Sequence, residues 1–178
     1  MYTNRFWLIR RFFLMKIQAT IDGTLEQMKH KKLTSRAKKT VKIHAVISGA
    51  MGVIPLPPVG VAMIIANNLK MLHKLSSIYG VEYRKDIGKA AISSFLVGCG
   101  TFSISGRIIW GLSSVAPMAA PVIGVVTIPL FATSATYAIG QLFVQHFESG
   151  GTFLTFDPDK VRGHYAELFK EGKELANT

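Results

Sequence analysis

The chain has 178 residues, of which 49% are hydrophobic and only 17% are charged, yet its formal net charge is +11. A soluble domain carries about 25% charged residues, so this chain has too little polar surface to cover its apolar content. An apolar middle with basic flanks favours an anionic membrane as partner and excludes nucleic acid, because no base-reading residues accompany the charge. With one cysteine, Cys99, the chain has no intrachain disulfide and no cysteine metal cage.

Residues 1–44 are expected to form a basic amphipathic arm. They contain eleven Lys and Arg against Asp22 and Glu26. An imperfect helical stripe of large apolar residues runs along the start of the arm: Phe6, Ile9, Phe13 and Ile17. This pattern predicts a helix on an anionic membrane surface, although a solvated basic linker explains residues 29–39 nearly as well. The predicted membrane-surface or partner-binding residues are Arg5, Arg10, Arg11, Lys16, Lys31, Lys32, Arg36, Lys38 and Lys39.

The first hydrophobic block is predicted to be a short helical hairpin. Its arms, Val41–Ile54 and Val59–Leu72, flank the uncharged stretch IPLPPVG at 54–60. Each arm is short for a membrane crossing, which takes about 20 residues. We therefore expect a re-entrant or interfacial hairpin, or one packed against the second block.

The second hydrophobic block is predicted to be a spanning hairpin, with arms at Ala90–Leu112 and Val122–Gln145. The tip is expected at Ser113–Pro121, because prolines end one helix and begin the next. Arg107 lies close enough to this tip to reach the interface by snorkelling. Small residues recur at every fourth position and predict close helix packing: Ala90, Ser94, Gly98, Ala132, Thr136 and Gly140.

Residues 150–178 are expected to form a polar C-terminal helix after Gly150 and Gly151 break the preceding one. Asp157 is the predicted N-cap, with Pro158 at the first helical position. A helical apolar stripe follows: Val161, Tyr165, Leu168 and Phe169. This stripe docks either on the protein's own bundle or on a partner helix.

The chain is thus predicted to be all-α, with a basic arm at 1–44, a double-hairpin membrane domain at 45–149 and a polar helix at 150–178. Every basic cluster lies at the open ends of the hairpins. The positive-inside rule then places both termini and the 70–89 connector in the cytoplasm.

The sequence offers no catalytic constellation. It lacks the phosphate-binding motif G-x-x-x-x-G-K-[ST], and its five histidines show no metal-ligand spacing. His73 and His146, near the open ends of the two hairpins, could approach one another. We expect no enzyme, no cofactor and no metal.

Two segments carry a family resemblance. VIPLPPVGVAMIIANNLKMLHKLSSIYGVEY at 53–83 and YAIGQLFVQHFESGGTFLTFDPDKV at 137–161 resemble the YcjF-type membrane domain, a bacterial domain of unknown function. The resemblance covers roughly residues 45–175. It implies a cytoplasmic-membrane protein without known catalytic residues, often associated with small GTPases of the Era type.

Two functions follow as hypotheses. The first is a non-catalytic membrane scaffold that presents its basic and amphipathic helices to a cytoplasmic partner, which the resemblance suggests is a small GTPase. The second is a homo-oligomeric pore or membrane-perturbing protein. A pore needs a polar stripe along the depth of a helix, and the serines and threonines of the second hairpin do not share one face.

Overall fold

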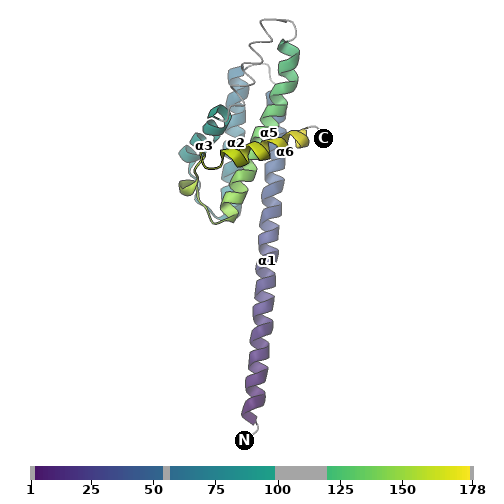
Figure 1. Cartoon of the computed structure of the whole chain (residues 1–178), viewed down its shortest axis with the longest axis vertical. Helices are drawn as coiled ribbons and strands as arrows, with labels where there is room; N and C mark the ends of the chain where they lie inside the picture. The colour runs from purple at the N-terminus through teal and green to yellow at the C-terminus, as the bar shows by residue number, and fades with distance from the viewer. Residues whose placement is uncertain (1–2, 54–56, 99–119, 177–178) are drawn as a thin grey trace. The chain divides into compact units, whose positions relative to one another are not determined.

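The computed structural model describes the backbone of residues 3–53, 57–98 and 120–176, and the side chains of Arg11 and of residues 14–53, 59–96 and 128–176. Over these residues the protein is all-α, as predicted, with no strand. Its helices are α1 (Thr3–Gly52), α2 (Pro57–Tyr79), α3 (Lys85–Gly98), α5 (Ala120–Glu148), the 3₁₀ turn η1 (Phe153–Thr155) and α6 (Arg162–Ala176) (Figure 1). The chain divides into two compact units, Met1–Ser35 and Arg36–Thr178.

The boundaries of the first two helices differ from those predicted. α1 continues through position 44, where the basic arm was expected to give way to a separate apolar helix. No proline interrupts it before Pro55, so nothing local ends the helix there. α2 begins at Pro57, a residue suited to the first helical position. It ends where Gly80 adopts a φ of +68° and the Val81 N–H donates to the Ser76 carbonyl at 2.9 Å.

The second predicted hairpin is described only in part. α3 begins at Lys85, five residues before the predicted arm, and α5 contains the whole Val122–Gln145 arm, Pro129 included. Arg107 and positions 113–119 of the expected tip lie outside the described residues. Within the part that the structure does describe, no helix has both the length and the apolar character needed to cross a membrane.

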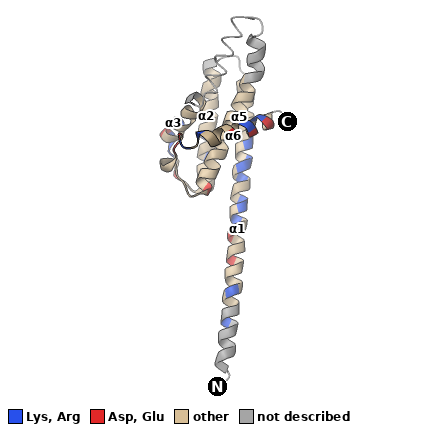
Figure 2. Cartoon of the chain, in the orientation of Figure 1, with Lys and Arg blue, Asp and Glu red and all other residues tan. Residues whose placement is uncertain are grey.

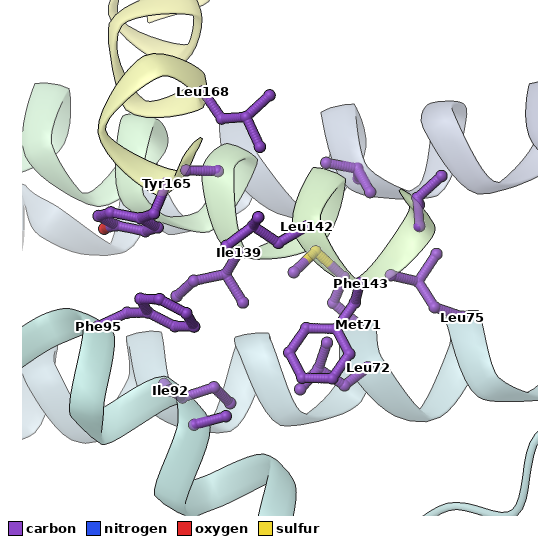
Figure 3. Close-up of a cluster of buried hydrophobic side chains, with 14 of the residues drawn as sticks. Met71, Leu72, Leu75, Ile92, Phe95, Ile139, Leu142, Phe143, Tyr165 and Leu168 are labelled. Atoms are coloured by element: carbon purple, nitrogen blue, oxygen red, sulfur yellow. The ribbon is translucent and has the colours of Figure 1, made fainter. Parts of the chain in front are cut away.

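The core of the unit Arg36–Thr178 forms where α2, α3, α5 and α6 meet (Figure 3). Phe143 of α5 lies at its centre, fully buried. Its ring stacks on Phe156 at a centroid distance of 4.2 Å and contacts Phe153 at 5.4 Å and Phe147 at 5.6 Å. The segment after α5 therefore folds back to cover the helix that precedes it.

The segment after α5 contains one predicted helix end and one predicted helix start, and only the first is confirmed. The predicted break is confirmed, because α5 ends at Glu148 and Gly150 adopts a φ of +82°. The predicted N-cap is wrong: α6 begins at Arg162, well beyond Asp157. The Asp157 carboxylate instead accepts the Asp159 N–H at 3.1 Å, so it closes an Asx turn that competes with helix initiation.

The C-terminal apolar stripe packs within this chain. Tyr165, Leu168 and Phe169 are buried, and Val161 packs against the same core. The Tyr165 ring stacks on Phe95 of α3 at 4.8 Å. These side chains are therefore packed within the core of this chain and do not form an exposed face for a partner helix.

α6 approaches α5 closely at Gly172. A Cβ added there would lie 2.7 Å from Ser134 Cα and 2.8 Å from Ser134 O, whereas a Cβ at Gly163 would meet nothing within 4 Å. We expect Gly172→Ala to destabilise the fold by about 1–3 kcal/mol through overpacking. Gly163→Ala should instead stabilise it by up to about 1 kcal/mol through helix propensity. Urea unfolding curves of the two variants test whether the substitutions change the free energy of unfolding in opposite directions. Equal changes in the two variants would contradict this prediction.

Candidate functional site

One end of the unit Arg36–Thr178 exposes a group of large apolar side chains, here called the apolar end. They come from the last turns of α1, the residue that follows it, the first turns of α2 and one position of α5. Each is 37–60% exposed: Ile43, Val46, Ile47, Val53, Val59, Val61 and Ile128. Many large apolar side chains exposed at one end of a folded unit are typical of an interaction site. The apolar end is therefore the candidate functional surface.

Contacts between the helices fix which residues lie at the same level. His44 Nδ1 lies 2.8 Å from Asn67 Oδ1, and Asn67 Nδ2 donates to the His44 carbonyl at 2.8 Å. One turn away, a Cβ added at Gly140 of α5 would contact both Val41 and Met71. α1 and α2 are therefore antiparallel, with residues 41–44 level with residues 67–71.

Below the apolar end, at this level, lies a group of exposed lysines that we call the basic band: Lys38, Lys39, Lys42, Lys70 and Lys74. The antiparallel register places Lys42 level with Lys70 and Lys38 level with Lys74. No Lys, Arg, Asp or Glu occurs between positions 43 and 69, or between 120 and 144. In Figure 2 the visible described parts of α2 and α5 are mostly tan, the colour of residues other than Lys, Arg, Asp and Glu.

The depth of the apolar end matches one membrane leaflet. The ten α1 residues from Ile43 to Gly52 extend about 15 Å at a rise of about 1.5 Å per residue. A hydrocarbon core is about 30 Å thick, so this segment is about half as long. The size is the one expected of an interfacial or re-entrant hairpin.

A buried polar network lies inside the apolar end and joins three helices. Asn67 of α2 donates to Ser48 Oγ of α1 at 2.8 Å, and Thr136 of α5 donates to the same oxygen at 2.8 Å. Asn68 Nδ2 donates to Thr136 Oγ1 at 3.0 Å and to the Ile64 carbonyl at 2.9 Å. Ser48, Asn68 and Thr136 are fully buried. In apolar surroundings such bonds hold helices in one register.

Sequence reasoning did not identify this network, although two adjacent asparagines in a charge-free stretch were a visible signal. Asn68 Oδ1 is buried and has no hydrogen-bond partner among the described residues. An unsatisfied buried acceptor of this kind is costly. The position is therefore sensitive to the chemistry of the side chain it carries.

The predicted small-residue faces have different surroundings on the two helices. On α5, Ala132, Thr136 and Gly140 are buried, and Thr136 and Gly140 meet α1 and α2. On α3, Ala90 is exposed and Ser94 is half-buried, while Gly98 is described only by its backbone. α5 also lies close to α1, since added Cβ atoms at Gly49 and Gly52 would meet Thr133 and Pro129.

The predicted basic residues are exposed wherever the structure describes their side chains: Arg11, Lys16, Lys31, Lys32, Arg36, Lys38 and Lys39. The side chains of Arg5 and Arg10 lie outside the described residues. Arg36, Lys38 and Lys39 belong to the same unit as the apolar end, and the others belong to the unit Met1–Ser35.

His73 and His146 have separate surroundings. The His73 ring lies edge-on to Tyr83 at 4.7 Å, and His146 Nε2 lies 2.9 Å from the Thr152 carbonyl. Among the described residues, no group of three His, Cys, Asp or Glu side chains could hold a metal ion. The site consists of aliphatic side chains and lysines, whose chemistry is that of binding.

An all-α unit with an exposed apolar end and a neighbouring band of lysines is typical of helical proteins that bind membranes. Residues 18–174 match a family described as a domain of unknown function, DUF697, and the chain belongs to this family. It is 31% identical over 140 residues to "Magnetosome membrane protein 22" of Magnetospirillum gryphiswaldense, an alignment that covers 79% of this chain and 72% of that protein. No solved structure matches the chain.

Proposed function

We propose that this protein is a non-catalytic, membrane-associated scaffold whose apolar end enters one leaflet of an anionic membrane. The observation that carries the proposal is the shared boundary on α1 and α2, where exposed lysines give way to exposed aliphatic residues. The similarity to the magnetosome relative, which is named as a membrane protein, supports the same setting.

The forces at this surface favour reversible docking. Complete burial of a Val or Ile side chain is worth about 1.5–3 kcal/mol, and the side chains of the apolar end are already partly covered by the fold. Each lysine near an anionic surface adds about 1 kcal/mol. The two terms act together only if the helices enter with the apolar end leading and the basic band at the headgroups.

The surface left outside the membrane is the part we assign to partner binding. The resemblance to the YcjF-type domain makes a small GTPase of the Era type the partner we propose, in a bacterial cytoplasmic membrane with both termini in the cytoplasm. Co-purification of an epitope-tagged GTPase from the same genome tests this assignment separately from membrane binding.

Insertion depth is tested with an environment-sensitive fluorophore on single cysteines in a Cys99→Ala background. Val46→Cys and Val59→Cys should shift to the blue on vesicles of phosphatidylglycerol and phosphatidylcholine and be quenched by lipid-borne quenchers. Ser77→Cys, exposed on α2 beyond the basic band, is the matched control and should not respond. An equal fluorescence shift and equal quenching at positions 46 and 77 would contradict the proposed orientation.

Charge and apolar substitutions should affect vesicle binding in different ways. Lys42→Gln and Lys70→Gln should each weaken binding to anionic vesicles about 5-fold, the equivalent of about 1 kcal/mol per basic residue, and this loss should vanish in high salt. Val46→Glu should weaken binding at every salt concentration. Vesicle flotation with circular dichroism as the folding control distinguishes these outcomes, and salt-independent lysine effects would contradict the headgroup assignment.

A further inference from the structure

The unit Met1–Ser35 is a helical part of α1 that exposes an apolar seam of its own. Five side chains form it, each 41–63% exposed: Leu14, Ile17, Ile21, Leu25 and Met28. Successive spacings of three, four, four and three residues place all five within an arc of about 80°, given 3.6 residues per turn. So narrow a seam is typical of a coiled coil, whereas a helix packed on a broad surface shows a wider stripe.

The positions beside the seam are almost free of charge. With Leu14, Ile21 and Met28 at the heptad a positions, Ile17 falls at d, whereas Thr24 occupies the next d position and Leu25 the e position beside it. The remaining flanking e and g positions between residues 18 and 27 are uncharged: Gln18, Thr20 and Gln27. The hydroxyls of Thr20 and Thr24 donate to carbonyls of their own helix at 2.9 Å and 2.8 Å. These threonines can therefore be covered without losing a bond to water.

The charges of this segment lie away from the seam. Lys16, Asp22, Glu26 and Lys29 fall at the outer b, c and f positions, and Lys29 pairs with Glu26 at 2.7 Å along the helix. A helix on an anionic membrane carries its cations mainly on a polar face opposite the lipid, usually in clear excess. Within residues 14–29 the two basic residues are matched by two acidic ones, so this part of the helix fits another apolar seam better than it fits lipid.

We propose that a second copy of this chain covers the seam in a parallel two-stranded coiled coil over residues 14–28. The flanking charges select the orientation. In an antiparallel pair centred on Ile21, Arg11 would lie beside Lys32 of the second copy on both sides, and like charges repel. In a parallel pair Lys32 lies beside Gln27 of the second copy, so this repulsion is absent.

The end of the seam agrees with this register. The next inner position after Met28 is occupied by Lys31, and the following a position by Ser35. Apolar contact therefore stops at Met28, and the coiled coil is short. This inference does not depend on how the apolar end meets a membrane.

The test uses full-length protein with Cys99→Ala and single cysteines at Leu14, Ile21, Met28 or Ala19. Under mild oxidation on vesicles diluted with excess lipid, all three seam variants should form disulfide-linked dimers in high yield. Ala19 is exposed at the outer f position and should cross-link at least 10-fold less. An antiparallel pair would cross-link at Ile21 and not at Leu14 or Met28. Equal yields at Ala19 and Ile21, or none at the seam, would overturn the proposal.

A second variant separates this proposal from membrane docking. Ile21→Asp should convert the dimer to a monomer in light scattering of the purified protein, while vesicle binding through the apolar end persists for each copy. Loss of vesicle binding by a protein that was never dimeric would assign the seam to lipid and refute the coiled coil.

Discussion

Phe143→Ala is expected to lower the free energy of unfolding by about 3–5 kcal/mol, the usual cost of truncating a buried phenylalanine. The reason is its position: the ring is fully buried and contacts Phe147, Phe153 and Phe156. Removing it opens a cavity between α5 and the segment that leads to α6. Chemical denaturation followed by circular dichroism measures the loss.

The matched control lies in the same segment. Leu154 follows Phe153 directly but is 69% exposed, so Leu154→Ala should change stability by no more than about 0.5 kcal/mol. If both substitutions cost the same, the segment after α5 is not folded against Phe143, and the docking of η1 and α6 would have to be abandoned.

Features that depend on local chemistry were predictable from the sequence. The apolar spacing of 161–169 identified the buried face of α6, and Gly150 identified the end of α5, because both signals act within a turn or two of the chain. The prediction that Asp157 caps α6 was wrong for a reason that is equally local in the chain. An aspartate can close an Asx turn as readily as it caps a helix, and the local sequence does not decide between them.

Features that depend on register between helices were not predictable. The lysines at 42 and 70 are visible in the sequence, but their common level follows from the hydrogen bonds of His44 with Asn67 and from the contacts at Gly140. The continuity of α1 was missed because a change from basic to apolar residues resembles a boundary. Composition can change along a helix without ending it, since no backbone bond is lost.

The polar network leads to the second large effect. Asn68→Asp is expected to destabilise the protein by several kcal/mol at neutral pH. The side chain at this position is fully buried, and its Nδ2 donates to Ile64 O and Thr136 Oγ1. An aspartate replaces that donor by an oxygen facing a carbonyl, in a place where a charge is poorly solvated.

The pH dependence of the stability of the Asn68→Asp variant shows whether a buried charge causes the loss. Burial raises the pKa of an aspartate at this position above its ordinary value of about 3.9, so the folded variant binds more protons than the unfolded one. Stability relative to the parent protein should therefore be greatest below pH about 4 and should fall as pH rises through the raised pKa.

Asn68→Leu is the control that separates charge from shape. It removes Oδ1, which has no partner among the described residues, together with the two donated bonds, and it fits the apolar surroundings. The buried acceptors Ile64 O and Thr136 Oγ1 lose the bonds that Asn68 donated, so the Leu variant should be less stable than the parent by about 1–3 kcal/mol. Because it introduces no charge, this loss should be smaller than that of the Asp variant at neutral pH and the same at every pH. A Leu variant as unstable as the Asp variant would mean that the amide bonds themselves hold α2 against α5. A stable Asp variant would mean that water reaches this site, and the apolar end would then be too open to enter a membrane as proposed.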